Sequence, residues 1–375
     1  MAQLNGWFDV TDYGVDRTKR ITHSDGIKRA IDAAKSAGGG NVWFPEGAYF
    51  LGNAGVELNC GNITLAGEGR SSTIHVTDWT SIPFPVDSPN ITIRELSIVH
   101  DRDEVSAPFN PRNYPDTIRI VGPRASNVLL KNLHLECPTV GIRALEVGDS
   151  LTISQISGQQ LKTGIEIEKA RGNVNVNGVA FAPLWNNTAP VTKFQHDSLV
   201  AIKSIGNIAQ SPIQFSNIVA THCKAGFLFT GEGDPDQIDP NLKINAASNT
   251  SCVTGIVIEG SPKALDVKNY VFYGLEGALS ECAIHAYDDF GFLKVGQMTS
   301  LRCGANAIRI DRSHHDVLLD GLWLQNWDQS GRRFPAIEST SGTKVKVSKP
   351  HFYHTPDSTA HPDRPQISAT GVVFE

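Results

Sequence analysis

The feature that most constrains the fold of this chain is a short repeat that returns at a fixed period. Residues 141–147 read Gly-Ile-Arg-Ala-Leu-Glu-Val, and residues 164–170, 23 positions later, read Gly-Ile-Glu-Ile-Glu-Lys-Ala. In both copies a second strand-like run starts nine residues after the first, and the same frame begins again at positions 255, 283 and 307. At least five units therefore share one internal register.

A period in the low twenties, with alternating apolar residues, is typical of a solenoid of parallel strands. The unit is too short for a pair of helices, and its alternation has the period of two that marks strands. A leucine-rich repeat has a similar length, but its Leu-x-x-Leu-x-Leu signature is absent. We therefore expect an all-β fold, a single-stranded right-handed parallel β-helix that occupies residues 51–355.

The segment 1–50 has a different pattern, which predicts a cap for the open end of the solenoid. Residues 8–14 form a short alternating strand, and Ser24-Asp25 can cap a helix whose apolar residues recur with helical spacing. The glycines at 38–40 end that helix. A short N-terminal capping helix over the first coil would cover a sheet edge that is otherwise open.

Three runs in this segment carry a family resemblance. They are Phe-Asp-Val-Thr-Asp-Tyr-Gly (8–14), Asp-Gly-Ile-Lys-Arg-Ala-Ile-Asp-Ala-Ala (25–34) and Gly-Gly-Gly-Asn-Val-Trp-Phe-Pro-Glu-Gly-Ala-Tyr (38–49). Together they resemble the N-terminal signature of the pectate-lyase-like superfamily, in its tailspike and polygalacturonase-type branch. The resemblance implies a capped β-helix that acts on an oligo- or polysaccharide. Tailspike relatives also imply a homotrimer and an extracellular or virion-associated location.

The resemblance does not identify the catalytic mechanism. The polygalacturonase run of Asn-Thr-Asp, paired aspartates and Gly-His-Gly does not occur in this chain, nor does the Asp-Pro-His-Glu run of the mannuronan epimerases. Members of one fold place different catalytic groups on it, so the reaction must be argued from the residues themselves.

Composition and charge exclude several other classes. The net charge of −6 and the pI near 6.1 give no reason to expect nucleic acid as a partner. No apolar run approaches the roughly 18 residues of a membrane span. The first residues lack the basic and apolar regions of a signal peptide, so a cytoplasmic location stays open beside the extracellular one.

Insertions interrupt the repeat near residues 101–116, 181–197 and 231–250, and residues 356–375 read as an irregular C-terminal tail. Insertions in a solenoid project from one face, often the binding face, so the first of them is expected to wall a groove. Several strands begin with an asparagine, and we expect these side chains to stack as a hydrogen-bonded ladder at a coil corner. They are Asn62, Asn90, Asn127 and Asn173.

The chemistry is sought in the outward positions of the repeat. In Gly-Ile-x-Ile-x the isoleucines point inward, so the two x positions should stack from coil to coil as two columns that face solvent. The first column reads Arg143, Glu166, Val257, His285, Arg309, and the second reads Leu145, Glu168, Glu259, Tyr287, Asp311. Lys203 is assigned to the same face. The alternative is a solvated surface with casual salt bridges.

Two carboxylate pairs fit hydrolysis of a glycosidic bond, which needs one carboxylic acid and one carboxylate. Glu259 and Asp311 are expected two coils apart, roughly 9.6 Å, and Glu166 and Glu168 lie on one strand, roughly 6.6 Å apart. Inverting glycosidases hold their carboxyl groups about 6.5–9.5 Å apart. Polysaccharide hydrolysis is therefore the preferred hypothesis, with either pair as the catalytic residues.

Two other functions stay open. A polysaccharide lyase removes a proton beside a uronate carboxylate, so His285 or Tyr287 would exchange the proton, and Arg309, Arg143 or Lys203 would neutralise the carboxylate. The third hypothesis is a carbohydrate-binding tailspike or adhesin without catalytic activity.

The insertions and the outer strands supply binding candidates. Trp185 and Trp323 could stack on a sugar ring, or they could pack against a neighbouring loop or subunit. Acidic residues crowd the third insertion, where they could bind calcium or form a solvated turn. They are Glu232, Asp234, Asp236 and Asp239. No other cofactor and no further metal site are expected, since the six cysteines include no C-x-x-C pair and read as buried thiols.

Overall fold

The computed structural model describes residues 6–101, 104–206, 212–231, 241–260, 263–275, 280–288, 290–312, 316–340, 344–355, 367–369 and 372–374. The chain consists of two compact units, unit 1 (Met1–Phe194) and unit 2 (Gln195–Glu375). In both, the fold is the right-handed parallel β-helix that the repeat predicts.

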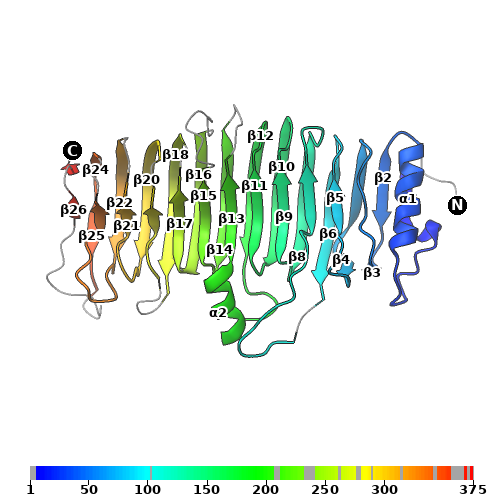
Figure 1. Ribbon diagram of the computed structural model, residues 1–375, viewed down its shortest axis with the longest axis horizontal. Helices are drawn as coiled ribbons and strands as arrows, with labels where there is room; N and C mark the ends of the chain where they lie inside the picture. Colours follow the sequence, from blue (N-terminus) through cyan, green and yellow to red (C-terminus); the bar gives the residue numbers. More distant parts are fainter. Residues whose placement is uncertain are drawn as a thin grey trace. The chain divides into compact units, whose positions relative to one another are not determined.

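Unit 1 alternates strands between two parallel sheets as the chain advances (Figure 1). Its elements are β1 (Trp7–Asp9), a 3-10 helix (Val10–Tyr13), α1 (Ser24–Ser36), β2 (Gly40–Phe44), β3 (Gly47–Leu51), β4 (Ile63–Val76), β5 (Phe84–Val86), β6 (Thr92–His100), β7 (Ile118–Val121), β8 (Val128–Glu136), β9 (Val140–Leu145), β10 (Ser150–Gln159), β11 (Thr163–Glu168) and β12 (Asn173–Phe181). The first sheet runs β1-β2-β4-β6-β8-β10-β12, with β3 also paired to β4, and the second runs β5-β7-β9-β11. We call them sheet A and sheet B.

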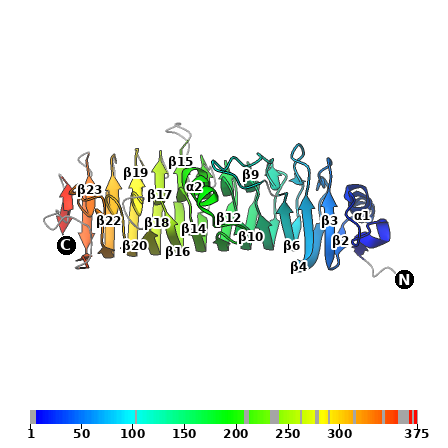
Figure 2. The same cartoon turned by 90° about the horizontal axis from the view of Figure 1, so that it is seen from below.

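Helix α1 lies beside β1 and β2 at the start of unit 1, as the capping role predicts (Figure 2). It buries Ile27, Ala30, Ile31 and Ala34. The expected cap at Ser24 is wrong, because Ser24 is the first helical residue and His23 precedes it without a side-chain cap. The Ser24 hydroxyl instead accepts a hydrogen bond from the Gly52 amide at 3.2 Å and donates to the Ala54 carbonyl at 3.4 Å, so it joins the helix to the next segment.

Three of the four expected asparagines form a ladder at one corner of unit 1, and Ser150, which donates to Asn127 at 3.0 Å, occupies the next rung in place of Asn173. Asn62, Asn90 and Asn127 all have positive φ angles, of 64°, 58° and 53°, a region that asparagine tolerates better than most residues. The Asn90 amide donates to Asn62 at 2.9 Å, and the Asn127 amide donates to Asn90 at 3.2 Å. One residue type thus turns the chain and links successive coils.

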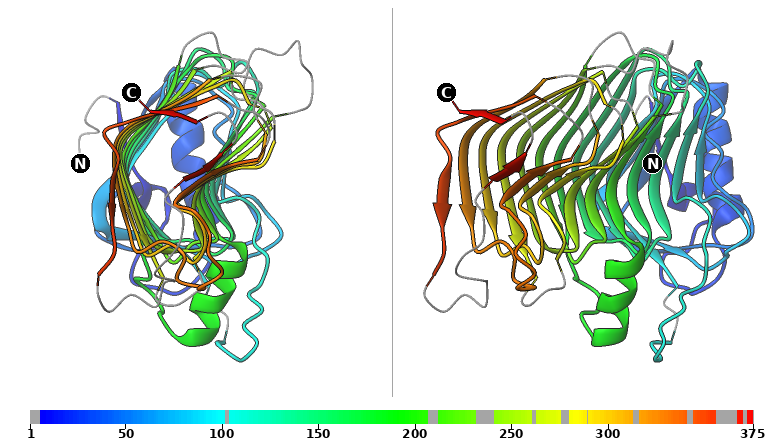
Figure 3. Two further views of the ribbon diagram at one scale, coloured as in Figure 1. Left: turned by 90° about the vertical axis from the view of Figure 1, so that its left-hand side faces the viewer. Right: turned by 60° about the vertical axis from the view of Figure 1, so that its left-hand side comes forward.

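A second hydrophobic cluster forms outside the solenoid of unit 1. Phe109, Leu161 and Val191 are buried together, with Trp185 and Phe194 packed against them. Val191 and Phe194 belong to α2 (Ala189–Ser198), and Figure 3 shows α2 and the segment before β7 protruding from the same edge. The expected insertion at 181–197 therefore contains a helix that the sequence pattern did not reveal.

Unit 2 repeats the alternation of strands. Its strands are β13 (Val200–Ile205), β14 (Ile213–Thr221), β15 (Ala225–Thr230), β16 (Asn241–Cys252), β17 (Thr254–Glu259), β18 (Ala264–Gly274), β19 (Ile284–Ala286), β20 (Phe292–Leu301), β21 (Ile308–Ile310), β22 (Val317–Gln325), β23 (Ile337–Ser339), β24 (Val345–Ser348), β25 (His351–Tyr353), β26 (Ile367–Ala369) and β27 (Val372–Phe374). Sheet A of this unit runs β14-β16-β18-β20-β22-β24-β27, and β25 also pairs with β22. Sheet B runs β13-β15-β17-β19-β21-β23-β26.

The core of unit 2 lies between its two sheets and is rich in aromatic residues. Phe215, Phe227 and Phe229 have ring centroids 6.0–6.1 Å apart, within the range favoured by aromatic pairs. All three are fully buried. Across the described part of the chain, no helix has the length and apolar character that crossing a membrane requires.

Candidate functional site

The register of sheet B in each unit reproduces the first expected column, with additional rungs. In unit 1, Arg119 pairs in register with Arg143, which pairs with Glu166. In unit 2, the first column reads Lys203, Leu228, Val257, His285, Arg309, Glu338. The rungs of Arg119, Leu228 and Glu338 were missed because their strands lack the Gly-Ile-x-Ile pattern. Strands β17, β19 and β21 are consecutive, so Glu259 and Asp311 do lie two coils apart.

In unit 1, the arginines of this column form ion pairs with nearby carboxylates. Asp116, from the segment before β7, lies 2.6 Å from Arg119 and 3.6 Å from Arg143. The Arg143 Nε atom lies 2.8 Å from Glu166 Oε1, as an ion pair without the alignment of a hydrogen bond. Glu166 and Asp116 are each only 3% exposed, although the sequence analysis expects Glu166 to face solvent. Each carboxylate here thus has a cationic neighbour.

The column of unit 2 centres on Asp311, which follows β21 directly. Its Oδ2 atom accepts a hydrogen bond from His285 Nε2 at 3.0 Å, and its Oδ1 atom accepts one from Arg309 Nε at 2.8 Å. Glu338 lies 4.0 Å from the same Arg309 nitrogen. Burial favours the neutral carboxyl, but the hydrogen bonds from His285 and Arg309 outweigh it and lower the pKa of Asp311. Asp311 is therefore held ionised and oriented by two donors.

The imidazole of His285 is buried and holds the Asp311 carboxylate in place through this hydrogen bond. It is 5% exposed, and burial lowers its pKa even though Asp311 opposes that change. A neutral ring must carry its proton on Nε2 to donate to Asp311. Its Nδ1 atom is buried and has no hydrogen-bond partner among the residues that the structure describes. His285 is therefore placed to orient Asp311 rather than to reach a substrate.

Tyr287 lies on top of this imidazole. The two ring centroids are 3.5 Å apart and the rings are nearly parallel, and Tyr287 is 41% exposed. Partial burial, helped by the charges of Glu281 and Glu259, raises the pKa of its hydroxyl to about 12. Tyr287 thus presents an aromatic face and a protonated hydroxyl near Asp311, flanked by acidic residues.

The part of sheet B around Asp311, which we call the open centre of unit 2, is rich in negative charge. Glu259 and Glu281 are exposed, Asp311 and Glu338 are half-buried, and Arg309 is the cation that contacts this group. The sequence analysis did not single out Glu281, Glu338, Asp116 or Arg119, because each lies outside the Gly-Ile-x-Ile frame. A count of charged residues per rung, rather than per repeat, would have found them.

The remaining candidates lie away from this centre. Trp185 packs on Phe109 with ring centroids 6.2 Å apart, which is the loop packing foreseen as an alternative to sugar stacking. Trp323 is exposed on β22 of sheet A, with its ring 5.6 Å from that of His351. Lys203 and Glu168 are half-buried on sheet B, in β13 and β11. Glu232, Asp234, Asp236 and Asp239, the expected calcium ligands, lie outside the described residues.

No protein-family model matches the sequence. A stretch of 122 residues is 31% identical to mannuronan C5-epimerase AlgE6 of Azotobacter vinelandii, and the match covers 28% of this chain and 14% of that protein. The chain therefore spans well under two thirds of this curated relative.

Solved structures are similar over nearly the whole chain. The catalytic unit of a GH87 α-1,3-glucanase from Streptomyces thermodiastaticus aligns with a TM-score of 0.66 at 14% identity, over 98% of this chain and 70% of that one. An exopolygalacturonase from Thermotoga maritima aligns with a TM-score of 0.52 at 12% identity, over 98% of this chain and 91% of that one. At these identities the likeness shows the fold alone, which is a right-handed parallel β-helix.

Proposed function

We propose that the chain is a glycoside hydrolase that cleaves a neutral polysaccharide at the open centre of unit 2. The observation that carries the proposal is Asp311, an ionised carboxylate held by two donors and flanked by further carboxylates. The names of the similar proteins support a polysaccharide as substrate, since they include a glucanase, a polygalacturonase and an epimerase of mannuronan.

In this mechanism Glu259 is the general acid and Asp311 the general base. Glu259 donates its proton to the glycosidic oxygen as the bond to the anomeric carbon breaks. Asp311 accepts a proton from the water that attacks that carbon from the opposite side. The two residues lie two coils apart, so their separation is roughly 9.6 Å, which leaves room for the water and predicts inversion at the anomeric centre.

Three neighbouring residues would assist the reaction without exchanging protons with the substrate. His285 and Arg309 fix the direction in which Asp311 accepts the proton of the water. The exposed ring of Tyr287 lies one coil from both Glu259 and Asp311, where its face can pack on the apolar face of a sugar.

Elimination on a uronate is less well supported by this geometry. His285 is buried, and the hydroxyl of Tyr287, with a pKa near 12, keeps its proton at neutral pH. Arg309 is already bonded to Asp311, and the surrounding carboxylates would repel the carboxylate of a uronate substrate. A neutral glycan meets none of these obstacles.

The test is an activity panel of neutral and acidic polysaccharides, with α-1,3-glucan and polygalacturonate among them. We expect new reducing ends on a neutral polymer without the ultraviolet absorbance of unsaturated uronates, and proton NMR should show the inverted anomer first. Asp311→Asn and Glu259→Gln should each lower kcat by about 10²–10⁴-fold. Asp320→Asn, which changes an exposed carboxylate on sheet A, is the matched control.

Three outcomes would contradict the proposal. Absorbance that rises together with reducing ends would establish a lyase. Full activity of Asp311→Asn would remove this centre from the mechanism. Binding without cleavage across the whole panel would favour a carbohydrate-binding protein.

A further inference from the structure

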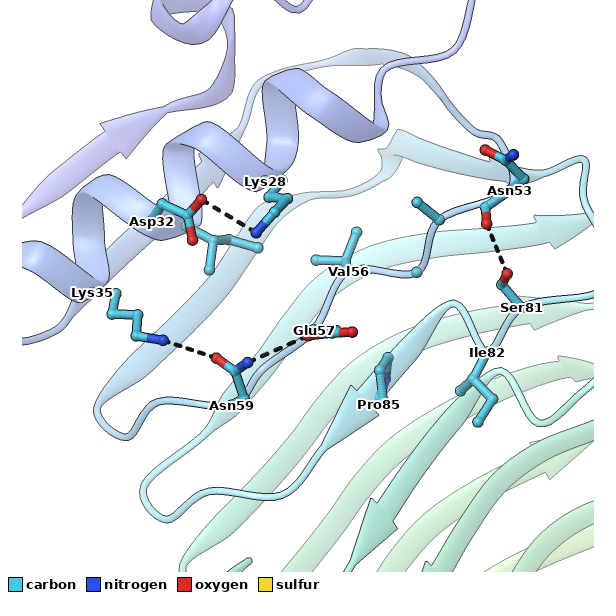
Figure 4. A pocket seen from close by; sticks show the side chains of 13 residues that line it. Lys28, Asp32, Lys35, Asn53, Val56, Glu57, Asn59, Ser81, Ile82 and Pro85 are labelled. Atoms are coloured by element: carbon cyan, nitrogen blue, oxygen red, sulfur yellow. Dashed lines mark hydrogen bonds and ion pairs between the residues drawn. The ribbon is translucent and has the colours of Figure 1, made fainter.

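A cleft beside the capping helix of unit 1 has no part in the proposed hydrolysis. It has a volume of about 600 Å³ and lies between one face of α1 and the segment that precedes β5 (Figure 4). This volume is within the range of about 300–1,000 Å³ typical of sites for small ligands. The helix supplies Lys28, Ile31, Asp32 and Lys35 to its wall.

A second cleft of about 260 Å³ continues from the first along sheet B of unit 1. The two clefts share Glu57, Asn59 and Pro85, and the second extends to Arg119 and Val121 on β7. A ligand that fills both must be elongated. A chain of linked sugars has this form, whereas a single compact metabolite would fill only one of them.

The polar groups of the cleft suit hydroxyl groups, which both donate and accept hydrogen bonds. Asn59 is held between two partners, because Lys35 donates to its carbonyl at 3.2 Å and its amide donates to Glu57 at 3.3 Å. Asp32 accepts from Lys28 at 3.3 Å on the opposite wall (Figure 4). Donors and acceptors are therefore positioned before any ligand arrives, which lowers the entropy cost of binding.

The charges of the two clefts cancel. Their cations are Lys28, Lys35 and Arg119, and their anions are Asp32, Glu57 and Asp87. A polyanion would meet as much repulsion as attraction, so the balance favours an uncharged ligand. Ile31, Val56, Ile82 and Pro85 line the same space and give it the apolar surface on which the carbon–hydrogen faces of a sugar can pack.

From these observations we propose that the cleft between α1 and the start of sheet B binds a short segment of neutral oligosaccharide and is not a catalytic site. It would hold a polysaccharide on the protein independently of cleavage. The proposal does not depend on the function proposed for unit 2, since an inactive enzyme or a protein that only binds carbohydrate would retain the cleft.

The experiment measures binding to the full chain carrying Asp311→Asn, which prevents turnover. Isothermal titration uses nigerotetraose and maltotetraose as neutral probes and tetragalacturonate as the acidic probe. We expect a neutral probe to bind, and we expect Asn59→Ala to weaken its binding by about tenfold, since it removes a polar group with two fixed partners. Ser81→Trp, which fills the cleft from its rim, should abolish this binding and leave unchanged any binding of the probe at the open centre of unit 2.

The matched control is Asn245→Ala, which removes an exposed amide from sheet A of unit 2 and should leave the affinity unchanged. The proposal is overturned if neither neutral tetrasaccharide binds, if tetragalacturonate binds more tightly than both, or if Ser81→Trp binds as well as the parent. Circular dichroism of each variant separates loss of binding from loss of fold. The polysaccharide activity panel is scored separately, so a failure of hydrolysis and a failure of binding are distinguishable.

Discussion

Replacing Arg143 by methionine tests whether the ion pairs of unit 1 stabilise the fold rather than serve a reaction. Its guanidinium lies 2.8 Å from Glu166 and 3.6 Å from Asp116, and both carboxylates are 3% exposed. Methionine keeps much of the apolar stem but removes the charge. Breaking a buried ion pair from one side typically costs about 3–5 kcal/mol. Because Asp116 keeps its 2.6 Å contact with Arg119, the lower end of that range is expected.

The assay is urea and thermal unfolding of the full chain, with Arg171→Met as the matched control. Arg171 pairs with Glu146 at 3.2 Å, but the two side chains are 50% and 39% exposed, so its loss should cost less than about 0.5 kcal/mol. For a unit of nearly 200 residues, a loss of about 3 kcal/mol should lower Tm by about 6–12 °C. A cost of Arg143→Met no larger than that of Arg171→Met would refute the reasoning.

Three further predictions concern His134, the asparagine ladder and Glu259, the proposed general acid. Burial, together with Arg70, lowers the pKa of His134 to about 4, so the unfolded chain takes up its proton first. Stability should fall as pH drops from about 6.5 to about 4, and urea unfolding of His134→Gln should show a smaller fall. Asn90→Ala should destabilise the fold by about 2 kcal/mol, from two lost hydrogen bonds and a strained left-handed residue, whereas Asn90→Gly, compared by urea unfolding, should cost about half as much. Thr230 is the neighbour of Glu259 on the adjacent strand, so Thr230→Lys places a cation beside the proposed acid and should lower kcat for hydrolysis, while Thr230→Gln should not.

The fold could be predicted from the sequence because the residues that pack inward recur at a fixed period. Ile142 and Ile165 stack in register on adjacent strands, and each copy of the repeat must keep such a residue at the same place. The corner asparagines were predictable for a similar reason, since positive φ angles restrict the residue types that fit. Helix α2 was not predictable, because its buried residues pack against Phe109 in a distant insertion and leave only a weak helical pattern in the local sequence.

The site was predicted less completely, since its chemistry depends on neighbours one coil away. The repeat aligned His285 with Arg309 and placed Asp311 on the same face, and the register agrees with this alignment. It did not reveal Glu338, which follows an irregular segment after β22. Nor could the sequence distinguish Glu166 from Glu259 as catalytic candidates, because the burial of one and the exposure of the other depend on side chains outside the repeat.

Whether a charged column is a reactive surface depends on how its charges are neutralised between coils. Side chains on adjacent coils lie about 4.8 Å apart, close enough for a cation in one coil to neutralise a carboxylate in the next. In unit 1 Arg143 does this for Glu166, which is buried beside it. In unit 2 Arg309 is bonded to Asp311 on its own chain segment, and the coil that carries Glu259 supplies Val257 as its other outward residue. The same scaffold therefore holds a stabilising network in one unit and an exposed acidic centre in the other, and the difference is the placement of an arginine one coil away.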